Sequence, residues 1–299
     1  MNKLATFIIV VGVALTLAPT LPMWHLARAL DYTYTTPLMK FTVTENGEVP
    51  QLEAPLGYEH IYAGDLLEGY LVSYAGGEGY VTEYSMYEDR YGIVTVGSVE
   101  VENSASRIIV GTVTQDSLGN LQIDQFFVAS KAFKYVGIKM TVTNLGGSPI
   151  SSLVVKRFCD MDVDTAGTMG WADYDNYFNY LPALGMPYAW TTSSQPPPHP
   201  GRASHYLAMA TYPNPAIWNL DGWEYYYDRD TPQGPSGVTF GDLAPLVHWN
   251  VGTLGPHQSV TFYVVYAVGN NLGDMFLNVV RGRQAAFAIP WTFVSLPPV

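Results

Sequence analysis

The chain has 299 residues, with 14 Lys and Arg against 26 Asp and Glu, so its formal net charge is −12. Proteins that bind nucleic acids need clustered Lys and Arg, and this sequence has no basic run longer than two residues, so we expect no nucleic-acid partner. Hydrophobic residues make up 48% of the chain, which is enough for a packed core and excludes an intrinsically disordered protein.

Residues 1–29 have the pattern of an export signal. Lys3 precedes an uncharged run from Leu4 to Trp24, and Ala27-Arg28-Ala29 supplies the small residues of a cleavage site. The alternative is a retained anchor, because 21 uncharged residues could just cross a bilayer. Two prolines late in the run favour cleavage, since they would interrupt a spanning helix. We therefore expect a secreted protein, at the cell surface or beyond, with no membrane span in the mature chain.

The pattern of residues 30–161 indicates a succession of short strands. Runs of β-branched and aromatic residues are separated by turn residues such as Asn46-Gly47 and Asn103-Ser104, and no helical period competes with them. The expected strands cover residues 38–44, 66–74, 80–86, 91–101, 105–114, 121–128, 133–143 and 150–158. This pattern is typical of an all-β sandwich or barrel.

Residues 162–235 differ in composition. They contain ten prolines and many aromatic residues, and the run Gln195–Pro200 must be extended. We expect a long aromatic and Pro-rich insertion within a single domain that covers residues 30–299. After the insertion, residues 246–251 and 260–268 are expected to form a strand pair, and Leu272–Arg283 is expected to form one short C-terminal helix.

The expected strand pair carries a resemblance to known proteins. The run W-N-V-G-T-L-G-P at residues 249–256, followed by S-V-T at 259–261 and A-V-G at 267–269, resembles the closing hairpin of large "supersandwich" β-domains. Such domains occur in galactose-mutarotase-like proteins and in many secreted surface proteins, and their hairpins prefer Gly where His257 stands. Residues 142–164 similarly resemble their mid-sheet hairpin. The resemblance implies a large antiparallel β-sandwich and no particular activity.

An acidic cluster follows the last strand of the first half. Asp160, Asp162 and Asp164 alternate along the chain, so they would share one face if the strand continued through them. Three like charges this close need a cation or hydrogen-bond donors. Asp173 and Asp175 follow in the next loop, and oxygen ligands of this kind suit calcium. We predict a calcium site built from these five residues, with a solvated acidic loop as the alternative.

The aromatic insertion offers a second kind of site. Its tryptophans could stack on a sugar, and the candidates are Trp171, Trp190, Trp218 and Trp223. Glycoside hydrolysis also needs two carboxylates about 5 to 10 Å apart. The candidate acids are Asp162 or Asp164 together with Glu224, Asp228 or Asp230. Because aromatic side chains in β-proteins mostly fill cores, this carbohydrate interpretation comes second.

Other reactive residues give weaker signals. The histidines at positions 60, 199, 205, 248 and 257 form no H-x-H or H-E-x-x-H motif, which argues against a zinc centre. Cys159 is the single cysteine, so it cannot form an intrachain disulfide, and we expect a buried thiol.

Cleavage after Ala29 would leave a free terminal strand that includes Leu30, Tyr32 and Tyr34. Such a strand can pair within its own sheet, or it can add to the edge of a neighbouring copy and so build a filament. The sequence favours a secreted, non-enzymatic subunit of a filament, sheath or S-layer, with copies of itself as partners and calcium as the metal. The alternative is an exported carbohydrate-binding or glycoside-acting domain that uses the aromatic loop 171–230 to bind a glycan.

Overall fold

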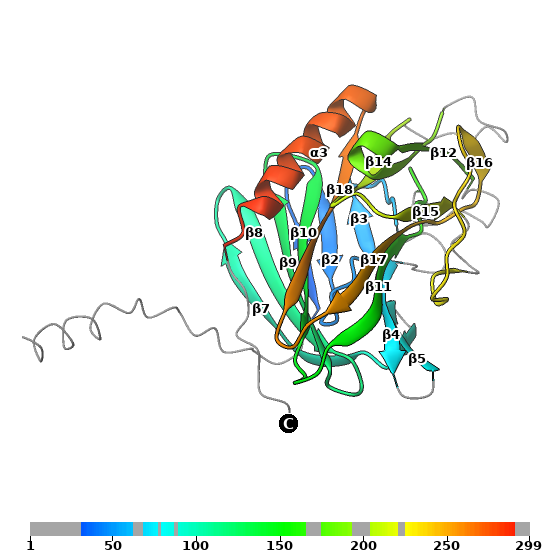
Figure 1. Ribbon diagram of the computed structural model, residues 1–299. Coiled ribbons are helices and arrows are strands. Elements are labelled where there is room, and N and C mark those ends of the chain that lie inside the picture. The colour runs from blue at the N-terminus through cyan, green and yellow to red at the C-terminus, as the bar shows by residue number, and fades with distance from the viewer. Residues whose placement is uncertain are drawn as a thin grey trace, which may run out of the picture.

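The computed structural model describes residues 31–61, 68–76, 79–86, 89–165, 175–192, 204–220 and 225–290. The expected export signal and Leu30 lie outside these ranges. More than half of the described residues lie in strands, which pair antiparallel in two large sheets and one small one (Figure 1). The predicted all-β sandwich is therefore confirmed. Among the described residues, no helix has both the length and the apolar character needed to cross a lipid bilayer.

The first large sheet has nine strands. Its order is β16 (Thr239–Gly241), β12 (Asn176–Leu181), β13 (Met186–Trp190), β14 (Tyr206–Tyr212), β18 (Ser259–Gly269), β10 (Tyr135–Asn144), β9 (Leu121–Ser130), β8 (Arg107–Gln115) and β7 (Val94–Asn103). The second large sheet has six strands. Its order is β15 (Ile217–Leu220), β17 (Pro245–Leu254), β11 (Ile150–Cys159), β4 (Glu68–Gly76), β5 (Gly79–Met86) and β6 (Asp89–Tyr91).

The two strands expected to pair near the C-terminus are present but belong to different sheets. β17 pairs with β11 and β15, whereas β18 pairs with β10 and β14. The chain crosses from one sheet to the other between them, so Trp249 and Phe262 face each other across the core with ring centroids 4.6 Å apart. A ladder between β17 and β18 would place both strands in one sheet, and the two rings could then not be buried face to face between two sheets.

The insertion expected at residues 162–235 contributes to both large sheets. It supplies β12, β13 and β14 to the nine-stranded sheet and β15 to the six-stranded sheet. Pro182 lies in a short 3-10 helix, η2 (Pro182–Leu184), and Pro213 and Pro215 follow β14. These prolines occupy connections, where a missing backbone N–H does not interrupt a ladder. The four strands of this region carry eight of its 14 aromatic residues.

A third, small sheet consists of β1 (Tyr32–Thr35), β2 (Lys40–Val43) and β3 (Gln51–Glu53). Figure 1 shows β2 and β3 between the two large sheets, and Phe41 and Leu52 belong to the same buried cluster as both of those sheets. The turn after β2 is buried as well. The Tyr70 hydroxyl donates a 2.9 Å hydrogen bond to the Asn46 carbonyl oxygen, so the turn fills a polar part of the core.

A buried ion pair lies beside this turn. Arg157 and Glu68 have fully buried side chains, and Arg157 also donates to the Gln125 side-chain oxygen at 2.6 Å and to the Gly47 carbonyl oxygen at 3.3 Å. The Tyr266 hydroxyl donates to Glu68 at 2.6 Å. Such hydrogen bonds offset the cost of removing both charges from water. The pair therefore connects the two large sheets with the turn of the small one.

The predicted C-terminal helix is confirmed as α3 (Leu272–Phe287), which extends four residues beyond the expected end. The Asn271 side chain caps it by accepting the Asp274 backbone N–H at 3.0 Å. α3 packs on the outer face of the nine-stranded sheet, over β18 and β10. A Cβ on Gly137 of β10 would lie 2.7 Å from the Gly282 carbonyl oxygen, so this close packing needs glycine.

Candidate functional site

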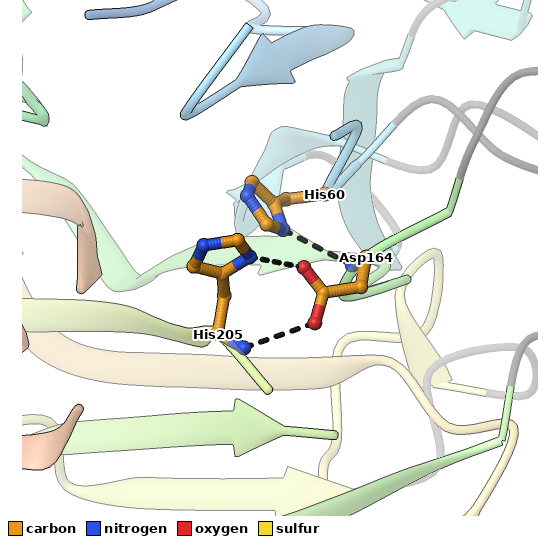
Figure 2. A group of neighbouring side chains, drawn as sticks. All are labelled: His60, Asp164 and His205. Carbon is orange, nitrogen blue, oxygen red and sulfur yellow. Dashed lines mark hydrogen bonds and ion pairs between the residues drawn. The ribbon is translucent and has the colours of Figure 1, made fainter. Parts of the chain in front are cut away.

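The candidate site lies on the inner side of the nine-stranded sheet, where three chain segments meet (Figure 2). Asp164 belongs to the turn that follows β11, His205 immediately precedes β14, and His60 follows β3. Glu59 and Thr165 join two of these segments through an isolated antiparallel bridge. The site therefore depends on tertiary structure rather than on a local motif.

Asp164 fixes the orientation of the His205 ring. One carboxylate oxygen bonds the ring Nδ1, and the other accepts the His205 backbone N–H at 2.9 Å and the Thr191 hydroxyl at 2.5 Å. Asp164 is 1% exposed and His205 is 5% exposed. Since Nδ1 bonds the carboxylate, the second ring nitrogen of His205 points away from Asp164 (Figure 2).

The ionised form of the Asp164 carboxyl group is strongly favoured. Burial alone would raise the pKa of this carboxyl group, but the hydrogen bonds from His205 and Thr191, together with nearby His60, outweigh burial and lower the pKa to about 2. Asp164 is thus ionised at neutral pH. A carboxylate in this state orients an imidazole and stabilises its protonated form, but it is not a proton donor.

His60 supports the loop that carries Asp164. Its Nε2 bonds the Ala54 carbonyl oxygen at 2.8 Å, and its Nδ1 accepts the Asp164 backbone N–H at 3.3 Å. Burial lowers the pKa of His60 to about 4, so the ring is neutral. The rings of His60 and His205 meet edge to face with centroids 5.9 Å apart, and Tyr58 packs against His205 in the same manner at 5.2 Å.

The three side chains also satisfy the spacing of a metal site. Ligand atoms of His60, Asp164 and His205 lie within 4.8 Å of one another. Both ring nitrogens of His60 are already engaged in hydrogen bonds, so a metal would have to displace one of them. The hydrogen-bond pattern therefore fits acid–base chemistry better than metal binding.

The predicted calcium ligands are divided by the fold. β11 ends at Cys159, so the strand geometry that would place Asp160, Asp162 and Asp164 on one face does not continue through them. Asp160 and Asp162 instead approach Asp242, with carboxylate oxygens within 4.8 Å, while Asp164 turns to His205. Neither cluster found among the described residues includes Asp175, and Asp173 lies outside the described ranges.

The candidate tryptophans are separated too. Trp171 and Trp223 lie outside the described residues, as does Glu224. Trp190 is on the outer face of the nine-stranded sheet, whereas Trp218 is buried and stacks on Tyr180 with centroids 4.3 Å apart. Tyr180 and Trp218 line a surface groove of about 420 Å³ together with Pro182, Pro215 and Gln233. β14 separates this groove from His205 by its full length, because His205 and Pro215 lie at opposite ends of that strand.

The remaining candidate residues contact other parts of the fold. Asp228 and Asp230 lie near Lys156, whose pKa burial lowers to about 8 in spite of these two carboxylates. Cys159 is buried, as expected, and burial raises the pKa of its thiol well above the ordinary value. Tyr32 and Tyr34 lie on β1, which pairs with β2 of its own chain, and the Tyr34 hydroxyl donates to Glu100 at 2.5 Å.

Sequence reasoning identified Asp164 but missed its partners. His60, Thr191 and His205 are far apart in the chain and match no motif, so nothing in a single sequence joins them. The turn at Asp164 has a left-handed backbone, with φ of 66°, and its carboxylate lies with His60 and His205 rather than with Asp162. A non-glycine residue in this conformation is uncommon and often marks a functional turn.

Comparison with known proteins bears on the fold. No family of known proteins matches the sequence, and no curated protein matches it. A bacterial glucoamylase in complex with acarbose matches 87% of this chain with a TM-score of 0.55 and 11% identity. That match covers 35% of the glucoamylase, so this chain spans about a third of its length.

Two further structures match at lower scores. A galactose mutarotase-like protein from Lactobacillus casei matches 80% of this chain and 100% of its own, with a TM-score of 0.41 and 12% identity. A galactose mutarotase related enzyme from Lactobacillus acidophilus matches 79% of this chain and 97% of its own, with a TM-score of 0.40 and 8% identity. At these levels of identity the likeness is one of fold alone.

These comparisons correct one expectation. The sequence favoured a protein that is not an enzyme, but the similar structure with a TM-score of 0.55 is a glucoamylase. The expectation of a non-enzymatic subunit is contradicted by that finding.

Proposed function

We propose that this protein is a carbohydrate-active enzyme and that His205 transfers the proton in its reaction. The observation that carries the proposal is the buried Asp164–His205 pair, in which a carboxylate with a pKa of about 2 holds one ring nitrogen and leaves the other pointing away. The fold shared with a glucoamylase supports a carbohydrate as the substrate class.

The chemistry follows from the hydrogen bonds. With Nδ1 held as a donor to Asp164, the second ring nitrogen is the acceptor and can take a proton from a sugar hydroxyl. The imidazolium that results lies beside an ionised carboxylate, which stabilises its charge. The same nitrogen can then return the proton to a sugar oxygen. Opening or closing an aldose ring and cleaving a glycosidic bond both require a proton transfer of this kind.

The site favours a histidine over a pair of carboxylic acids. Asp164 was a candidate for general acid in glycoside hydrolysis, but its low pKa prevents it from donating a proton at neutral pH. Neither cluster of acidic and imidazole side chains among the described residues joins Asp162 or Asp164 to Asp228 or Asp230. Proton transfer by His205, as in interconversion of sugar anomers, is therefore the better supported reaction.

The test uses the full chain and a panel of small substrates. Polarimetry follows the mutarotation of freshly dissolved aldoses, and release of nitrophenol follows hydrolysis of aryl glycosides. We expect turnover of at least one substrate, and a loss of roughly 100-fold or more in kcat/KM for His205→Asn, the usual size of a general acid–base contribution. Asp164→Asn should also lose activity, because a neutral amide does not stabilise the imidazolium.

His257→Asn provides the matched control. His257 is an exposed turn residue with φ of 58°, a conformation that Asn tolerates, so its replacement should leave turnover unchanged. Full activity in His205→Asn, or the same loss in His257→Asn, would contradict the assignment of His205. Absence of turnover across both substrate sets would contradict the proposed enzyme class.

A further inference from the structure

A row of four aromatic side chains crosses one end of the nine-stranded sheet. Phe240 of β16 lies opposite Tyr177 of β12, Tyr177 lies opposite Trp190 of β13, and Trp190 lies opposite Tyr206 of β14. Their ring centroids are 4.8, 5.5 and 6.0 Å apart in that order. Because each ring is in register with the next, the row runs perpendicular to the strands across all four of them.

The row belongs to the outer face of the sheet. The residues that alternate with it, Phe178, Ala189 and Leu207, point into the main core. α3 covers neighbouring strands of the same face and packs mainly on β18 and β10. Phe240 is 43% exposed, and the other three rings of the row are partly exposed. The row is thus accessible aromatic surface beside the helix.

The strands that carry the row are uncharged. The four strands contain no Asp, Glu, Lys, Arg or His, although the chain carries 26 acidic and 14 basic residues. The hydrogen-bonding groups on this face are uncharged, and they include the side chain of Asn179, which bonds Tyr188. The four strands themselves offer no cation to a polyanion. A partner that matches this surface is itself neutral, with both apolar faces and hydroxyl groups.

We propose that this aromatic row, formed by Tyr177, Trp190, Tyr206 and Phe240, binds a neutral oligosaccharide or polysaccharide chain. The C–H faces of sugar rings pack on aromatic side chains, and the hydroxyl groups of the sugar can bond the phenols and amides beside them. A row of four rings offers contact to several consecutive sugars, whereas a monosaccharide would use one or two of the rings.

This binding surface is separate from the Asp164–His205 pair. Trp190 and Tyr206 point to the outer face, and the adjoining residues Thr191 and His205 direct their side chains to Asp164 on the inner face. The two sites therefore lie on opposite sides of β13 and β14. The surface would anchor the protein on a glycan whether or not the inner site catalyses a reaction, so its test does not depend on turnover.

The experiment is native affinity electrophoresis of the full chain in gels that contain soluble starch, dextran, xylan or galactomannan. We expect at least one of these neutral polysaccharides to retard the protein. Trp190→Ala and Tyr177→Ala should each weaken binding by roughly tenfold, which corresponds to the loss of one aromatic contact. Trp190→Phe keeps a ring and should lose less. Thermal melting of each variant establishes that it is folded.

Tyr212→Ala is the matched control. Tyr212 lies on the same face of β14, is 51% exposed, and contacts Phe287 of α3 instead of the row. Its replacement should leave retardation unchanged. Equal retardation of the wild type and folded Trp190→Ala would overturn the proposal, and so would the absence of retardation in all four gels. Binding that survives in inactive His205→Asn supports the surface independently of the proposed activity.

Discussion

Asp164 holds His205 at two points, since one carboxylate oxygen bonds the ring Nδ1 and the other accepts the backbone N–H of the same residue at 2.9 Å. A carboxylate that binds both the ring and the backbone fixes the side-chain torsions as well as the position of the histidine. The turn after β11 therefore determines where the second ring nitrogen points. Changes in that turn should affect proton transfer even where they leave the sandwich intact.

Burial of His60 predicts a loss of stability in mild acid. The pKa of this residue falls from an ordinary 6.5 to about 4, so between these values the unfolded chain binds more protons than the folded one. The contribution of His60 to folding is complete above about pH 6.5 and is lost as the pH falls toward 4. Its full size is about 3 kcal/mol. Urea unfolding at a series of pH values measures it.

Comparison with His60→Gln isolates this contribution. Asp124 acts in the opposite sense, because burial raises its pKa to about 7 and its contribution is lost as the pH rises. Subtracting the unfolding free energy of His60→Gln from that of the wild type at each pH removes contributions that both proteins share, such as that of Asp124. The free-energy difference between wild type and variant should shrink steadily from pH 6.5 to pH 4. A difference that is independent of pH would show that His60 is not buried in its neutral form.

Gly47 and Gly57 provide a matched pair for testing the buried turn. Both have a left-handed backbone, with φ of 88° and 89°, so alanine is strained at either position. A Cβ on Gly47 would lie 2.0 Å from Nε2 of Gln125, whereas a Cβ on Gly57 meets nothing within 4 Å. We expect Gly57→Ala to cost about 1 kcal/mol of unfolding free energy, and Gly47→Ala to cost about 2 kcal/mol more. Equal midpoints in urea would contradict the buried position of the turn.

The calcium site predicted from the sequence becomes more specific in the structure. Asp160, Asp162 and Asp242 bring carboxylate oxygens within 4.8 Å of one another, and calcium prefers such ligands. If calcium binds there, a free concentration 100-fold above Kd stabilises the fold by about 3 kcal/mol, and chelation should lower Tm accordingly. Asp162→Asn and Asp242→Asn should abolish the effect of the chelator, whereas Asp175→Asn should retain it. A Tm that is insensitive to chelation would exclude the site.

Self-assembly through the N-terminal strand also stays a prediction. β1 lies at the edge of the small sheet, so its other side is a potential partner for a second chain. Deleting residues 30–36 should abolish polymers without unfolding the protein. Tyr34→Phe loses the bond to Glu100 but keeps the strand, and it should still assemble. Negative-stain microscopy distinguishes the outcomes, and polymers that persist after the deletion would refute strand addition.

Much of the architecture was predictable because strands have local signals. Alternation of apolar and polar residues predicted β10, β11, β17 and β18, and the apolar residues of Leu272–Arg283 predicted α3. Which strands pair was not predictable from these patterns. β17 and β18 follow one another closely in the chain yet enter different sheets, since the rings of Trp249 and Phe262 are buried between the two.

The candidate site, like the strand pairing, depends on contacts between distant parts of the chain that local patterns do not predict. That acidic residues gather after β11 follows from the sequence alone, because alternation and composition are local properties. That Asp164 bonds His205 while Asp160 and Asp162 lie beside Asp242 is visible in the folded protein alone. That division depends on a left-handed turn and on strands from distant parts of the chain, and long-range packing of this kind has no periodic signature in the sequence.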